Sequence, residues 1–141
     1  MLNYSSEGQK MMDIAIFENE YEQVEYSFQL VNKLYYDNQL KYSIFEKSQE
    51  FKDLNEIKKY ALIFIDLDLS LKSELDGYSL IEKFIQIKKS LPIIILTGAA
   101  KVEDTLKSKG LPAYEILLKP LNYKKLLKVF EKYITTPKIK N

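Results

Sequence analysis

The sequence contains no cysteine and no histidine, and all 21 of its basic residues are lysine, because arginine is also absent. The lack of cysteine and histidine excludes disulfides, Cys/His zinc sites, Ser-His-Asp triads and Cys-His catalytic pairs. The lack of arginine disfavours any site that needs a bidentate clamp on a phosphate or a carboxylate. Any chemistry must therefore come from carboxylates, lysine, hydroxyl groups and the backbone.

Long apolar runs are absent as well. No stretch approaches the roughly 18 apolar residues of a membrane span, and the start of the chain, MLNYSSEGQKMM, lacks the apolar segment of a signal peptide. Walker A and GxGxxG phosphate-binding motifs are missing, and the net charge of +1 does not favour a nucleic-acid partner. We therefore expect a cytoplasmic protein that binds neither a membrane nor nucleic acid directly.

The length and composition that remain suit one globular domain, with 141 residues of which 46% are hydrophobic. We expect a disordered extension over residues 1–11, a folded domain over residues 12–134 and a C-terminal tail over residues 135–141. The tail is too short for an output domain. The chain is therefore expected to be either a stand-alone domain or a piece of a longer protein.

Apolar runs alternate with segments of helical periodicity along the folded part. Strands are expected at 13–17, 42–47, 61–66, 92–98 and 114–120, and helices at 21–35, 48–60, 78–89, 101–110 and 122–134. Ser48 is expected to be the N-cap of the second helix. Strands that are apolar throughout and alternate with helices indicate an α/β fold, with a five-stranded parallel sheet that is covered on both faces.

Polar residues of interest follow the apolar runs of four predicted strands, at the edge of the sheet where such folds bind ligands. They are Glu18, Asn19 and Glu20 after the first strand, Asp66 and Asp68 after the third, Thr97 after the fourth and Lys119 after the fifth. Clustered carboxylates repel one another unless a cation lies among them. Oxygen ligands favour a hard cation, Mg²⁺ or Mn²⁺. An ammonium and a hydroxyl group beside them suit a site that places a phosphoryl group on a carboxylate.

The ordered set of residues resembles the receiver domain of two-component response regulators, over about residues 12–134. That family has an acidic pair after the first strand, a phospho-accepting aspartate after the third, Thr or Ser after the fourth and Lys-Pro after the fifth. The matching positions here are Glu18-Asn19, Asp66, Thr97 and Lys119-Pro120, and Asp76-Gly77 matches the turn before the third helix. The resemblance implies a doubly wound, flavodoxin-like (βα)5 fold.

The resemblance also implies roles for these residues. Asp66 would accept phosphate from a sensor histidine kinase, a phosphotransfer protein or a small phosphodonor, and Thr97 and Lys119 would contact the phosphoryl group. The implied ligands of Mg²⁺, or of Mn²⁺, are Glu18, Asn19, Asp66 and the backbone carbonyl of Asp68.

The function implied is a phosphoacceptor switch that catalyses only its own phosphorylation and dephosphorylation. It would signal to a downstream protein effector. A dimer through the face of the fourth helix, fifth strand and fifth helix is one option.

Three features depart from the family pattern. Asn19 stands where the family usually has aspartate, so we expect weaker Mg²⁺ binding. Ile116 occupies the position of the aromatic switch residue, three before the lysine, so the rotation of a ring cannot be the signal. The loop 66–77 is also longer than usual.

Two alternatives stay open. Asp66-Leu67-Asp68 after a strand also resembles the first motif of haloacid-dehalogenase-type phosphatases, with Asp66 as the nucleophile and Asp68 as the general acid and base. Two βα units precede the motif, however, and no later predicted strand ends in a pair of acidic residues, which disfavours this alternative. The other is a pseudo-receiver that binds partners without being phosphorylated.

Overall fold

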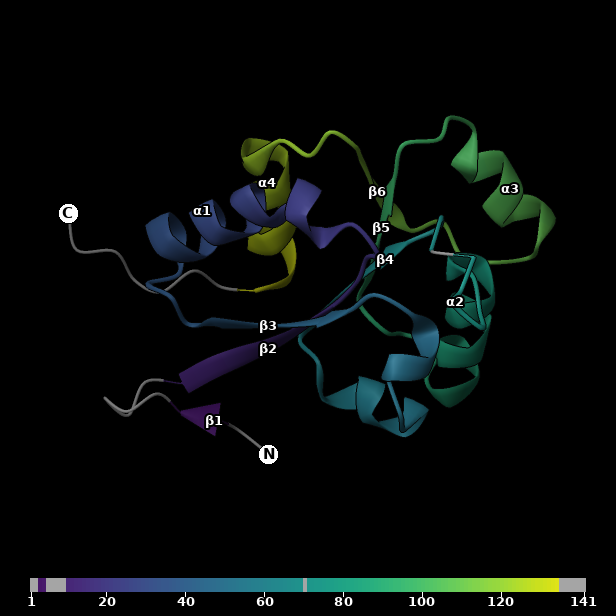
Figure 1. The fold of residues 1–141 in the computed structure, drawn as a ribbon, viewed down its shortest axis with the longest axis horizontal. Helices are drawn as coiled ribbons and strands as arrows, with labels where there is room; N and C mark the ends of the chain where they lie inside the picture. Colours follow the sequence, from purple (N-terminus) through teal and green to yellow (C-terminus); the bar gives the residue numbers. More distant parts are fainter. Residues whose placement is uncertain (1–2, 5–9, 70, 135–141) are drawn as a thin grey trace.

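The computed structural model describes residues 3–4, 10–69 and 71–134. Its sheet contains five parallel strands, β2 (Lys10–Phe17), β3 (Leu40–Phe45), β4 (Leu62–Asp66), β5 (Ile93–Thr97) and β6 (Glu115–Leu118). They lie in the order β3-β2-β4-β5-β6 (Figure 1). This is the doubly wound, flavodoxin-like order, so the predicted fold class is confirmed.

Helices cover the two faces of the sheet. Helices α1 (Glu25–Tyr35) and α4 (Tyr123–Tyr133) lie together on one face, and α2 (Gly77–Ile87) and α3 (Val102–Ser108) lie on the other (Figure 1). Alternate residues of each central strand point to opposite faces, so that Phe64 packs with the α1/α4 layer and Ile65 with the α2/α3 layer. The strands are apolar throughout because both of their faces are buried.

The prediction of a helix over 48–60 is wrong. The segment forms two short 3₁₀ turns, η2 (Ser48–Glu50) and η3 (Leu54–Lys59), separated by extended backbone at Phe51 and Asp53. Asp53 caps the start of η3, because its carboxylate accepts a hydrogen bond from the backbone N–H of Asn55 at 3.1 Å. Ser48 is therefore not the N-cap of an α-helix.

Ser48 instead contacts the loop that follows β4. Its backbone N–H donates to the hydroxyl oxygen of Ser73 at 2.9 Å, and its own hydroxyl oxygen accepts from the N–H of Leu75 at 2.9 Å. The side-chain nitrogen of Gln49 donates to the carbonyl oxygen of Lys72 at 2.9 Å. These bonds hold residues 72–75 of the loop after β4 against η2.

The beginning of the chain differs from the expected disordered extension at the residues that the structure describes. Strand β1 (Asn3–Tyr4) pairs antiparallel with residues 10 and 11 at the start of β2. Residues 1–2 and 5–9 of the expected extension, and the expected tail at 135–141, lie outside the described residues. Within the described part of the chain, no helix combines the length and the apolar character needed to cross a membrane.

Helix α4 runs back along the sheet, away from the carboxyl ends of the strands. It begins after Asn122, whose side chain accepts hydrogen bonds from the first backbone N–H groups of the helix. At its other end, the carbonyl oxygen of Ile134 accepts a 2.9 Å hydrogen bond from the buried hydroxyl of Tyr36, which follows α1. The last described residue therefore lies near the amino ends of the strands.

Candidate functional site

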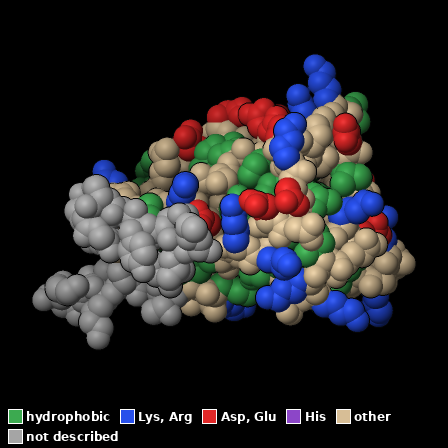
Figure 2. Space-filling model, turned by 90° about the horizontal axis from the view of Figure 1, so that it is seen from below, with side chains coloured by type: hydrophobic (Ala, Val, Ile, Leu, Met, Phe, Trp, Pro, Cys, Tyr) green, Lys and Arg blue, Asp and Glu red, His purple; other side chains and the backbone are tan. Residues whose placement is uncertain are grey.

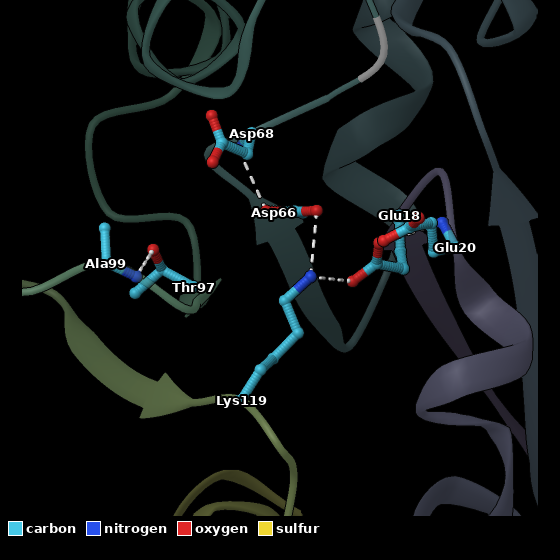
Figure 3. Close-up of polar contacts among 7 residues, drawn as sticks. All are labelled: Glu18, Glu20, Asp66, Asp68, Thr97, Ala99 and Lys119. Carbon is cyan, nitrogen blue, oxygen red and sulfur yellow. Dashed lines mark hydrogen bonds and ion pairs between the residues drawn. The ribbon is translucent and has the colours of Figure 1, made fainter.

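Four of the predicted site residues lie at the carboxyl ends of adjacent parallel strands. Glu18 follows β2, Asp66 ends β4, Thr97 ends β5 and Lys119 follows β6 (Figure 3). The strand register brings them together, since β4 neighbours both β2 and β5 and β5 neighbours β6. Glu18, Asp66 and Thr97 are at most 1% exposed. The sequence therefore placed these residues at the same edge of the sheet correctly.

Lys119 joins the two buried carboxylates. Its Nζ donates to Oε1 of Glu18 at 2.8 Å and to Oδ2 of Asp66 at 3.0 Å (Figure 3). The other oxygen of each carboxylate accepts a backbone hydrogen bond: Oε2 of Glu18 from Glu20, and Oδ1 of Asp66 from Asp68, both at 2.9 Å. Charged groups are tolerated out of water only when they are paired and hydrogen-bonded, as these two carboxylates are.

The pKa values of this cluster reflect the competition between burial and pairing. Burial raises the pKa of Glu18 above its usual value of 4.5, although the hydrogen bonds from Lys119 and from the backbone of Glu20 oppose this. Burial alone would lower the pKa of Lys119, but its hydrogen bonds to Glu18 and Asp66 and their charges raise it above 10.5. Lys119 therefore stays an ammonium at neutral pH and is available to offset a new negative charge.

Thr97 lies at the same edge, but its hydroxyl group points along the loop that leads to α3. Its Oγ1 accepts a 3.0 Å hydrogen bond from the backbone N–H of Ala99 (Figure 3). Its carbonyl oxygen accepts from the backbone N–H of Lys119 at 2.8 Å, which fixes the ends of β5 and β6 side by side. Among the described residues, the hydroxyl makes no hydrogen bond to Asp66 or Lys119. Because the hydroxyl oxygen only accepts in this hydrogen bond, its own O–H remains available as a donor.

Gly77 brings α2 against the strand end that carries Asp66. A Cβ atom at this position would lie 2.5 Å from the carbonyl oxygen of Asp66 and 2.5 Å from the Cα of Leu67, which is closer than atoms can approach. The preceding Asp76 caps the helix by accepting a 2.8 Å hydrogen bond from the N–H of Ser79. The sequence indicated a turn at Asp76-Gly77, but not this backbone contact.

The oxygens expected to hold a metal ion partly converge. The tip of the Asn19 amide lies 3.2 Å from the carbonyl oxygen of Asp68 and 3.3 Å from Oδ2 of Asp66. Cis ligands of Mg²⁺ at about 2.1 Å from the ion lie roughly 3 Å apart, so both distances suit a hard divalent cation when the amide presents its oxygen at this tip. Within residues 3–4, 10–69 and 71–134, no three acidic side chains form a metal-binding cluster by themselves. The donor set depends instead on an amide and a backbone carbonyl.

The side chain of Asp68 is exposed and points away from Lys119 (Figure 3). Only its backbone contacts Asp66, through the N–H that donates to Oδ1. A haloacid-dehalogenase-type phosphatase would need the Asp68 carboxylate beside the nucleophile as an acid and base. The observed orientation does not support that alternative.

Ile116 occupies a half-buried position on β6 and packs against the α2/α3 layer. A hollow of about 290 Å³ lies beside it, lined by the loop 99–101, the start of α3 and Leu118. Leu118 is 60% exposed.

Comparisons with known proteins agree with this geometry. The profile of the response regulator receiver domain family matches residues 14–131. The chain is 30% identical over 79 residues to the cell cycle response regulator CtrA of Brucella ovis, and the match covers 56% of this chain and 33% of that protein. The chain thus spans about a third of the length of the curated relatives it matches.

Two solved structures share the fold. The non-phosphorylated HemR receiver domain of Leptospira biflexa superimposes with a TM-score of 0.69 at 22% identity, and the match covers 92% of this chain and 99% of that one. A CheY-like receiver domain protein of Methanospirillum hungatei JF-1 gives a TM-score of 0.63 at 21% identity, and the match covers 86% of this chain and 92% of that one.

Proposed function

Because the chain belongs to the response regulator receiver domain family of two-component systems, we propose that it is a switch that is phosphorylated on Asp66. The observation that carries this proposal is the contact of Lys119 with the carboxylates of both Glu18 and Asp66 at the edge of the sheet. Such an ammonium supports a buried carboxylate and then a phosphoryl group on the same side chain.

The chemistry follows from these contacts. A carboxylate oxygen of Asp66 attacks the phosphorus of the donor, the bond from phosphorus to the donor's nitrogen or oxygen breaks, and an acyl phosphate forms. Lys119 Nζ, which is 3.0 Å from Oδ2 of Asp66, pairs with the added phosphoryl oxygens. Glu18 keeps the hydrogen bond that its Oε2 accepts from the backbone N–H of Glu20. Thr97 Oγ1, which accepts a hydrogen bond from the N–H of Ala99, donates its own proton in a hydrogen bond to a phosphoryl oxygen.

A divalent cation, Mg²⁺ or Mn²⁺, suits this chemistry because it offsets the negative charge of the incoming phosphoryl group. Asp66, the backbone carbonyl of Asp68 and the amide oxygen of Asn19 are the residues that would hold it. Glu18 is the fourth residue proposed to hold it, and both of its oxygens, like those of Asp66, accept hydrogen bonds in this structure.

The partners proposed are a sensor histidine kinase or phosphotransfer protein as the donor and a protein effector as the target. The response would appear on the face of α3, β6 and α4, where the exposed Leu118 borders the hollow beside Ile116. This face also contains the surface that we propose for a dimer.

The test is to incubate the protein with acetyl phosphate and Mg²⁺ and to weigh the intact protein. We expect the mass of one phosphoryl group to be added to the wild type, and none to be added to Asp66→Asn or in the presence of EDTA. An Asp68→Asn variant is the matched control and should still be modified. Absence of modification on the wild type with Mg²⁺ and Mn²⁺ would remove the phosphorylation mechanism and leave a pseudo-receiver.

A further inference from the structure

The side chain of Asn19 contacts two oxygens of the site that can only accept hydrogen bonds. One atom of its amide lies 3.2 Å from the carbonyl oxygen of Asp68 and 3.3 Å from Oδ2 of Asp66. An amide carries an oxygen at one end and an NH₂ group with two donors at the other. With the oxygen at this position, three acceptors would face one another. The hydrogen-bond network therefore assigns the nitrogen to it, donating to both partners.

The same position suits the amide oxygen once a cation is present. The amide atom lies 3.2 Å from one of these oxygens and 3.3 Å from the other, close to the roughly 3 Å between neighbouring ligands of a hard divalent ion. A half-turn of the amide about its Cβ–Cγ bond exchanges nitrogen for oxygen without moving the rest of the side chain. Terminal amide torsions are broad and roughly two-fold, so both orientations are accessible.

We propose that Asn19 is a metal-responsive residue whose amide nitrogen links Asp66 to Asp68 in the metal-free site and whose amide oxygen faces the cation in the occupied site. The inference rests on the proposed function only in that the site takes a divalent cation. Its consequence is regulatory, because the cation must displace two hydrogen bonds before it binds. The concentration of Mg²⁺ at which the switch becomes competent is thereby raised.

An aspartate at position 19 would behave differently in both states. A carboxylate cannot donate to Asp66 and Asp68, so the metal-free site would lose two hydrogen bonds and gain a repulsive charge beside Asp66. The occupied site would gain a charged ligand, and affinity for hard cations rises with the charge of the ligand set. Asn19→Asp is therefore expected to destabilise the metal-free protein and to strengthen its binding of Mg²⁺. A residue with only a structural role would not produce the stronger binding.

The experiment compares wild type with Asn19→Asp and Asn19→Ala by calorimetric titration with Mg²⁺ and by thermal unfolding in EDTA. We expect Asn19→Asp to bind Mg²⁺ about tenfold more tightly, as one added ligand charge suggests. We also expect it to melt at a lower temperature in EDTA and to recover with Mg²⁺. Asn19→Ala should melt lower in EDTA without gaining affinity. Asn55→Asp, which adds the same charge at an exposed position on η3, should change neither quantity.

A second measurement uses the wild type alone. The NMR signals of the Asn19 side-chain NH₂ group should shift when Mg²⁺ is added, because the group leaves its two acceptors. Unchanged signals at saturating Mg²⁺ would overturn the proposal, and so would an Asn19→Asp variant that binds no more tightly or melts no lower. If the metal response holds but acetyl phosphate does not modify Asp66, the proposed function fails and this inference stands.

Discussion

Lys119 differs from Lys132 in its surroundings. It pairs with the carboxylates of Glu18 and Asp66, whose side chains are 0% and 2% exposed. Lys132, in contrast, pairs with Glu115 at the surface. Removing the ammonium leaves two buried negative charges without a counter-charge, which is the costly way to break a buried ion pair. The stability of the site edge therefore depends on this one cation.

We predict that Lys119→Met destabilises the protein by about 3 kcal/mol at neutral pH. The pKa of Glu18, already raised by burial, should rise further in the variant because the opposing hydrogen bond is lost. A raised carboxyl pKa contributes stability that is fully present below the unfolded value of 4.5 and is lost as the pH rises through the folded pKa. The deficit of the variant should therefore shrink as the pH falls toward 4.5.

Urea unfolding at several pH values measures this deficit. Lys132→Met is the matched control, and its stability should follow that of the wild type across the same range because its ion pair is exposed. If the free energy of unfolding that Lys119→Met loses relative to the wild type stayed constant with pH, the buried carboxylates would not be the cause of the loss.

The site residues were predictable from the sequence to different degrees. Buried apolar runs fix where strands end, and parallel strands end at one edge, so Asp66, Thr97 and Lys119 could be placed together. The orientation of the Thr97 hydroxyl toward Ala99 and of the Asn19 amide toward Asp66 could not. Those depend on loop backbone atoms that no residue pattern encodes.

At the scale of elements, the sequence predicted the central strands better than the segment 48–60. Phe51, Leu54 and Ile57 recur at helical spacing and do point toward the core, but the backbone between them is extended or 3₁₀. The contacts of Ser48 with Ser73 and Leu75 compete with a helix start. Their partners lie 25 and 27 residues away, so a local pattern cannot reveal them.

The start of α2 depends on a residue without a side chain. We predict that Gly77→Ala destabilises the protein by about 2 kcal/mol, because the added Cβ would force Asp66 and Leu67 apart from the helix. Gly98→Ala is the control, since a Cβ there meets nothing within 4 Å. Chemical denaturation of both variants checks the difference. Equal stability of the two would show that α2 can shift away from β4 at no cost.

The whole molecule has two apolar layers that share one sheet. Phe64 belongs to the α1/α4 layer, where its ring lies 5.0 Å from that of Phe28 and 5.5 Å from that of Phe130. Its neighbours on β4, Ile63 and Ile65, belong to the other layer. Loss of packing in one layer is therefore expected to weaken the sheet that supports the other. Figure 2 shows one face of the molecule, on which lysines and acidic residues lie among apolar and uncharged side chains.

We predict that Phe64→Ala destabilises the protein by about 4 kcal/mol and that unfolding stays a single transition. Far-ultraviolet circular dichroism and tyrosine fluorescence should give the same urea midpoint. Tyr133→Ala removes a ring that is 44% exposed and should cost much less. Separate midpoints for the two signals would mean that the layers unfold independently.

The direction of α4 determines where other molecules can be tethered. The helix spans about 16 Å at roughly 1.5 Å per residue and delivers the chain to the end of the sheet opposite Asp66. A bead, surface or fluorescent label attached beyond Ile134 would therefore leave the edge with Lys119 open to a phosphodonor protein. Immobilisation through this end is the arrangement of choice for measuring partner binding.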